Sequence, residues 1–111
     1  MSTMLAQFQR TRAAAASLAM ASSELRNAIL ESLAALIREK SGEILQENQK
    51  DLDKMPSDHP MFDRLKLTQE RLDDLAESVI SVTQLPDPTG QVLSSKTLPN
   101  GLKLEKVTVP L

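Results

Sequence analysis

The sequence of 111 residues has no cysteine and very few aromatic residues. Without cysteine, these residues cannot form a disulfide, a thiolate metal site or a thiol nucleophile, which excludes a disulfide-stapled secreted domain. Phe8 and Phe62 are the only aromatic residues, so there is no platform on which nucleic-acid bases could stack. Three glycines are too few for a glycine-rich phosphate-binding turn, and no Gly-x-Gly-x-x-Gly motif occurs.

The sequence also lacks an excess of one charge and any long apolar run. Thirteen basic and fifteen acidic residues give a formal net charge of -2, without the basic bias of a nucleic-acid-binding domain. The wholly apolar runs are far shorter than the roughly 20 residues needed to span a bilayer. At this length the chain is one domain at most. These features predict a cytoplasmic protein with neither a nucleic-acid nor a membrane partner.

The first 23 residues contain Arg10 and Arg12 but no acidic residue, and they are rich in alanine and serine. This composition is shared by two kinds of segment. Mitochondrial transit peptides have it, and in that case the mature protein would begin near residue 24. Alanine is also the strongest helix former, and we favour a helix because the pattern continues into the next segment without a distinct cleavage region.

Helical patterns continue from residue 22 to residue 85. Ser22 or Ser23 is expected to cap one helix, and Ser41 to cap the next. The first of these helices has an apolar stripe at intervals of three and four residues, formed by Leu25, Ala28, Ile29, Leu33, Leu36 and Ile37. Residues 55–60 form a loop with two prolines. A short helical turn follows, and Thr68 then caps a helix whose stripe comprises Leu72, Leu75, Ala76, Val79, Ile80 and Thr83.

After residue 90 the pattern changes to two extended segments, 91–98 and 102–109, on either side of Pro99-Asn100-Gly101. Asn-Gly tolerates the positive φ values of a tight turn, which predicts a β-hairpin. The second strand is apolar on both faces, and an isolated hairpin is marginally stable in water. We therefore expect an interface with a larger sheet, the remainder of the same chain or another subunit. The predicted interface residues are Asn100, Gly101, Leu102, Leu104, Val107 and Val109.

Candidate chemical groups are few. His59 is the only histidine and lies in the proline-containing loop, where we expect it to be exposed to solvent. Asn48 and Asp51 share one helical face and could hydrogen-bond a neighbouring loop, which we favour, or hold a cation. No serine has the partners that would activate it as a nucleophile. The residues therefore predict no catalytic, cofactor-binding or metal site within this chain.

Four motifs, taken together, resemble a known family. They are Asn48-x-x-Asp51-Leu52; Met61-Phe62-Asp63-Arg64-Leu65-x-Leu67-Thr68-x-x-Arg71-Leu72; Asp87-Pro88-x-Gly90-x-Val92; and Asn100-Gly101-Leu102-x-Leu104-Glu105-x-x-x-Val109-Pro110-Leu111. They are similar to the N-terminal quarter of glutamate-5-semialdehyde dehydrogenase, or gamma-glutamyl phosphate reductase, in the aldehyde dehydrogenase superfamily. The reductase half of a bifunctional pyrroline-5-carboxylate synthase is a related possibility, which the position of Met1 disfavours.

The resemblance implies an α/β parent enzyme of which this chain is a mostly helical part ending in a hairpin. Residues 1–90 would be the helical N-terminal part of the cofactor-binding domain, and residues 91–111 the hairpin of the oligomerisation ribbon, truncated at residue 111. The family uses NADPH to reduce L-glutamate 5-phosphate to L-glutamate 5-semialdehyde and phosphate in proline biosynthesis. Its catalytic cysteine and its cofactor loops lie beyond residue 111. The fragment is therefore expected to be inactive alone and to bind no cofactor, and the full enzyme to be a homo-oligomer.

A second interpretation needs no missing enzyme. The chain would then be a stand-alone, non-catalytic helical module that binds a partner through its hairpin. The reading frame after Leu111 separates the two interpretations, because an open frame with a later cysteine is expected only for the reductase.

Overall fold

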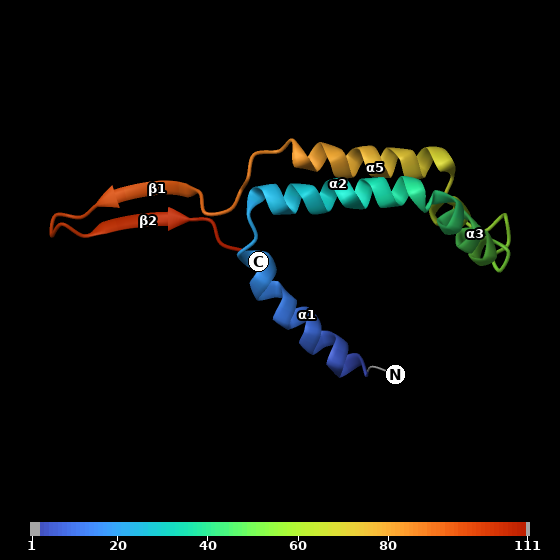
Figure 1. Ribbon diagram of the computed structural model, residues 1–111, viewed down its shortest axis with the longest axis horizontal. Helices are drawn as coiled ribbons and strands as arrows, with labels where there is room; N and C mark the ends of the chain where they lie inside the picture. The colour runs from blue at the N-terminus through green and yellow to red at the C-terminus, as the bar shows by residue number, and fades with distance from the viewer. Residues whose placement is uncertain (1–2, 111) are drawn as a thin grey trace. The chain divides into compact units, whose positions relative to one another are not determined.

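The computed structural model describes residues 3–110, which form five helices followed by a two-stranded antiparallel sheet (Figure 1). The helices are α1 (Met4–Ala19), α2 (Ser23–Glu39), α3 (Ser41–Leu52), α4 (Phe62–Leu65) and α5 (Gln69–Thr83), and the strands are β1 (Val92–Thr97) and β2 (Lys103–Val107). Glu24–Leu85 forms one compact unit, and the residues on either side of it belong to a second. The predicted fold class, mostly helical with a C-terminal hairpin, is confirmed.

Helix α1 forms through local interactions. The Ala6 N–H donates to the Thr3 hydroxyl at 3.2 Å, so Thr3 caps the N-terminus, and alanine-rich sequence carries the helix to Ala19. No described residue of α1 is buried, and Leu5 and Phe8 are 65% and 63% exposed. The helix predicted in the first segment is thus confirmed. No helix among the described residues combines the length and apolar character needed to cross a membrane.

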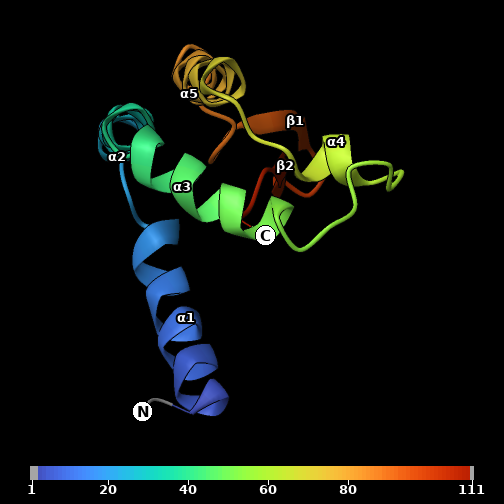
Figure 2. The ribbon, with the colours of Figure 1, turned by 90° about the vertical axis from the view of Figure 1, so that its right-hand side faces the viewer.

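Helices α2 and α5 run antiparallel and lie side by side in two perpendicular views (Figures 1 and 2). The Asn27 amide near the start of α2 donates to the Thr83 carbonyl at the end of α5, at 3.4 Å. Towards the other end of α2, Arg38 forms an ion pair with Glu77. Ala34 and Ala76 are both fully buried, one in each helix. The face of α2 that carries Asn27, Ala34 and Arg38 is therefore the face directed at α5.

The stripe predicted for α2 is not the stripe that the helix buries. Of its six residues, Ile37 alone is half-buried and the other five are exposed. Residues 30, 34 and 37 lie on the same side of the helix as Asn27 and face α5, so the buried stripe is displaced around the helix. Helix α2 has two apolar faces. The predicted stripe lies mainly on the face that is exposed to solvent, and the other face packs against α5.

Two expected helix caps have different outcomes. Helix α5 begins after Thr68, whose hydroxyl accepts a hydrogen bond from the Arg71 N–H at 3.1 Å, as predicted. Ser41, expected to cap α3, is instead the first residue of that helix, and Lys40 occupies the cap position without a side-chain hydrogen bond. The Ser41 hydroxyl donates to the Arg38 carbonyl at 2.9 Å and so satisfies a free acceptor at the end of α2. The prediction for Ser41 was wrong because α2 and α3 follow each other with a single residue between them.

The hairpin pairs β1 with β2, with Ser95 opposite Glu105 and Lys96 opposite Leu104. Residues 98–102 join the strands. The Leu98 N–H donates to the Leu102 carbonyl (2.7 Å) and the Gly101 N–H to the Leu98 carbonyl (2.9 Å), which closes a loop of three residues, 99–101. The loop needs one positive φ, at Gly101 (+87°), which suits a residue without Cβ. Asn100 contributes differently from the expectation: its φ is not positive, and its side chain accepts from the Leu102 N–H at 3.1 Å.

Candidate functional site

The clearest arrangement of polar groups lies where α3, α4 and α5 meet, and α3 contacts both of the other helices. Asn48 of α3 is 9% exposed and holds the connection between α4 and α5 through both ends of its amide. Its Nδ2 donates to the Leu65 carbonyl at 2.9 Å, and its Oδ1 accepts from the Leu67 N–H at 2.9 Å. Asn48 thereby acts towards this extended segment as a neighbouring strand would. Its predicted bond to a neighbouring loop is confirmed.

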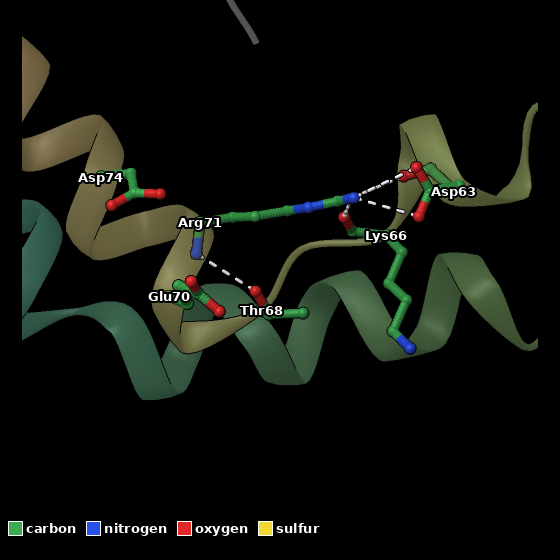
Figure 3. Close-up of a pocket in the computed structure, with 6 residues that line it drawn as sticks. All are labelled: Asp63, Lys66, Thr68, Glu70, Arg71 and Asp74. Carbon is green, nitrogen blue, oxygen red and sulfur yellow. Dashed lines mark hydrogen bonds and ion pairs between the residues drawn. The ribbon is translucent and has the colours of Figure 1, made fainter.

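Arg71 of α5 holds the same connection from the other side (Figure 3). Its guanidinium donates to the Asp63 carboxylate through two bonds of 3.0 and 3.1 Å. It also donates to the main-chain carbonyls of Asp63 and Lys66 at 2.6 and 2.5 Å. The planar fork of arginine suits this arrangement, since it presents several fixed donors to a carboxylate and adjacent carbonyls. We call Asn48, Asp63 and Arg71, with the segment between α4 and α5, the junction.

The junction explains why the second sequence motif has its spacing. Residues 66–68 lie between α4 and α5, and side chains of the neighbouring helices bond this part of the backbone. Asn48 of α3 accepts from the Leu67 N–H, and Arg71 of α5 donates to the Lys66 carbonyl. Among the described residues no buried side-chain nitrogen or oxygen is left without a partner. The structural roles of Asp63 and Arg71 were not anticipated from the sequence. Both residues stand in the second motif, but their separation of eight residues does not by itself indicate that the two side chains meet.

Two shallow hollows flank the junction, each of about 420 Å³. One is lined by charged and polar residues, among them Asp63, Lys66 and Arg71 (Figure 3). Asp63, Glu70 and Asp74 contribute three carboxylates to its wall against the two cations of Lys66 and Arg71, and the guanidinium of Arg71 is already engaged. The other lies over α3 and is lined by Glu43, Ile44, Glu47, Asn48, Asp51 and Leu67. Neither hollow brings together a nucleophile, a base and an oxyanion donor.

The remaining candidate groups do not converge. His59 is exposed, as expected, and its Nδ1 accepts from the Met61 N–H at 3.1 Å, a local bond that shapes the loop. Asp51, the other half of the predicted Asn48–Asp51 pair, is exposed beside the hollow over α3. Within residues 3–110 no three histidine, aspartate or glutamate side chains gather as a metal site requires. The one bond described for His59 is thus local to its loop, and Asp51 does not join the hydrogen bonds that Asn48 makes.

The predicted interface residues all lie on the hairpin and are exposed. Leu102, Leu104, Val107 and Val109 are 61%, 59%, 41% and 77% exposed, and Asn100 and Gly101 form the loop. Every residue of both strands is exposed, so neither face of the hairpin is buried. Leu111, which ends the fourth motif, lies outside the described residues. A sheet of two strands also leaves one hydrogen-bonding edge of each strand open.

The described residues thus define a class: a helical segment that carries a β-hairpin whose strands are exposed. Comparison with known proteins gives the particular relative. No family model matches the chain. It is 43% identical over 109 residues to gamma-glutamyl phosphate reductase of Chlorobium phaeobacteroides, covering 98% of the chain and 26% of that protein. It is 40% identical to gamma-glutamyl phosphate reductase of Geobacillus kaustophilus, covering 100% of the chain and 28% of that protein.

The fold agrees with the sequence match. The crystal structure of gamma-glutamyl phosphate reductase from Thermotoga maritima superposes with a TM-score of 0.88 at 28% identity, over 98% of this chain and 27% of that one. The resemblance drawn from the motifs is therefore confirmed: the chain is similar to gamma-glutamyl phosphate reductase over nearly its whole length. It spans about a quarter of the length of the curated relatives that it matches.

Proposed function

We propose that the chain is the N-terminal part of a gamma-glutamyl phosphate reductase. The complete enzyme would use NADPH to reduce L-glutamate 5-phosphate to L-glutamate 5-semialdehyde and phosphate, in the cytoplasm, during proline biosynthesis. The observation that carries this proposal is the coincidence of two matches. Identity of 43% and a TM-score of 0.88 both extend over 98% of the chain and select the same enzyme.

The proposal assigns the chain an architectural part in this reaction. The chain has no cysteine, and its polar residues form the junction, so the nucleophile and the cofactor loops would lie in the three quarters of the enzyme that it does not span. Residues 1–90 would belong to the cofactor-binding domain and residues 91–111 to the oligomerisation ribbon of a homo-oligomer. The exposed hairpin supports this, because an apolar ribbon gains stability when a neighbouring sheet or subunit covers it.

The reaction itself gives the direct test. In a chimera, this chain would replace the matching quarter of the Chlorobium phaeobacteroides reductase. We expect the chimera to oxidise NADPH with L-glutamate 5-phosphate, while the purified chain alone shows no turnover. The assay follows NADPH absorbance, with the parent reductase as positive control. An inactive but folded chimera beside an active parent would contradict the proposal. Turnover by the chain alone would contradict the placement of the chemistry elsewhere.

The interface role of the hairpin has its own test. Sedimentation of the chain is expected to show association that is lost when Leu102 and Leu104 are both replaced by serine, because the change removes apolar surface exposed on one face of the ribbon. The control replaces Lys103 and Lys106 by serine, which removes charge from the same strand and keeps both leucines. Equal association of the two double variants would rule out an apolar interface here.

A further inference from the structure

Helix α2 has a second apolar face, which the rest of its own unit, residues 24–85, leaves about half exposed. Its members are Leu25, Ile29, Leu33 and Leu36, which are 53%, 50%, 44% and 49% exposed. They follow one another at intervals of three and four residues, so they form a continuous stripe along the helix. We call this set the outer stripe.

The outer stripe is separate from the surface that α2 uses within its own unit. That surface carries Asn27 and Arg38, which bond to α5, and the fully buried Ala34. At 100° per residue, the outer stripe lies well over a quarter-turn around the helix from this surface. The polar side of α2, with Glu24, Glu31 and Glu39, occupies the remaining sector. A helix that is apolar on two sides usually lies between two packed layers, whereas a helix at the edge of a domain shows a single stripe.

We infer that the outer stripe of α2 is the docking surface for the remaining three quarters of the reductase polypeptide. This inference rests on the proposed function and adds to it the face through which the helical unit joins the enzyme. The length of the relatives supports this occupant: they contain nearly three times as much further polypeptide, since the chain covers 26% of one relative and 27% of the solved structure. This additional polypeptide could supply the second apolar layer against which a helix with two apolar faces packs.

The composition of the stripe favours a permanent intramolecular contact over a transient partner. All four side chains are leucine or isoleucine, and none is aromatic or charged. Transient interfaces are enriched in aromatic residues and arginine, whereas the interior of a domain is built from aliphatic side chains that interdigitate. The stripe therefore has the character of half of a domain core.

The test places the same substitutions in two contexts, the isolated chain and the Chlorobium chimera. Ile29→Gln with Leu33→Gln removes the centre of the stripe while keeping residues that favour helix. Glu31→Gln with Ala35→Gln is the matched control, two exposed positions of the same helix outside both apolar faces. In the isolated chain both double variants should unfold at the same temperature as the unsubstituted chain, because the replaced side chains are already exposed to water.

In the chimera the two double variants should diverge. We expect the stripe variant to lose about tenfold or more of the soluble activity and to unfold at a lower temperature, because two side chains would be buried as polar groups without partners. The control should match the unsubstituted chimera. Full activity and unchanged melting of the stripe variant would overturn the inference and leave the proposed function intact. Loss of folding in the isolated chain would also overturn it, by showing that the stripe belongs to the chain's own core. An inactive unsubstituted chimera overturns the proposed function, and the inference with it.

Discussion

Replacing Leu72 by alanine is expected to lower the free energy of unfolding of the helical unit by about 3 kcal/mol, the typical cost of truncating a buried leucine. Leu72 is 2% exposed and lies near the start of α5, a helix that contacts α3. Few large side chains are buried in this unit, so the cavity would remove a large share of a marginal stability. Urea unfolding followed by far-ultraviolet circular dichroism measures the effect as a lower midpoint.

The same helix offers a control for this prediction. Leu75 is three residues further along α5 and 49% exposed, so Leu75→Ala makes an identical chemical change outside the buried core. Its cost should stay below about 1 kcal/mol. If Leu72→Ala and Leu75→Ala shift the midpoint equally, then Leu72 is not the core residue that the structure makes it.

Replacing Asn48 by alanine is expected to cost about 2 kcal/mol, because it leaves the Leu65 carbonyl and the Leu67 N–H without partners in a partly buried position. The loss should be concentrated at the junction. Hydrogen exchange would then show the Leu67 amide opening faster than amides in the middle of α2, in addition to a lower urea midpoint.

Two further variants separate the contributions at Asn48. Gln49→Ala removes an exposed amide one residue away, whose Nε2 donates to Asp53, and should change stability by less than about 0.5 kcal/mol. Asn48→Asp keeps the acceptor for the Leu67 N–H and places an oxygen against the Leu65 carbonyl, so it should be at least as damaging as alanine. A neutral Asn48→Ala would mean that water replaces the amide and that the junction does not depend on it.

Much of the local structure was predictable because its causes lie within a few residues. Thr68 caps α5 through a hydroxyl three residues from its donor, and Gly101 supplies the positive φ that the hairpin loop needs. Both features can be identified from residue types in order. The hairpin was predicted from Asn-Gly between two extended segments. Its exposed apolar surface was predicted from a second strand that is apolar on both faces and has no larger sheet in this sequence to cover it. The family resemblance depended on the same kind of linear pattern.

The errors share a different cause. The Ser41 prediction failed because a cap depends on where the preceding helix stops, and α2 runs to within one residue of α3. The stripe chosen for α2 was apolar, but periodicity cannot say which of two apolar faces meets α5. The structural role of Arg71 was not predicted, because the carbonyls of Asp63 and Lys66 lie within hydrogen-bonding distance of it only after the chain turns between α4 and α5.

The order of residues was enough to predict the helices, the hairpin and the similarity to gamma-glutamyl phosphate reductase, because hydrogen bonding in helices and turns is local and motifs are linear. Two features could be seen only in the tertiary structure. Asn48 and Arg71 bond the segment between α4 and α5 from opposite sides. Helix α2 directs Ala34 towards α5 and leaves Ile29 exposed to solvent. Those features depend on how helices approach one another in space, and residues brought together in that way carry no fixed spacing along the chain.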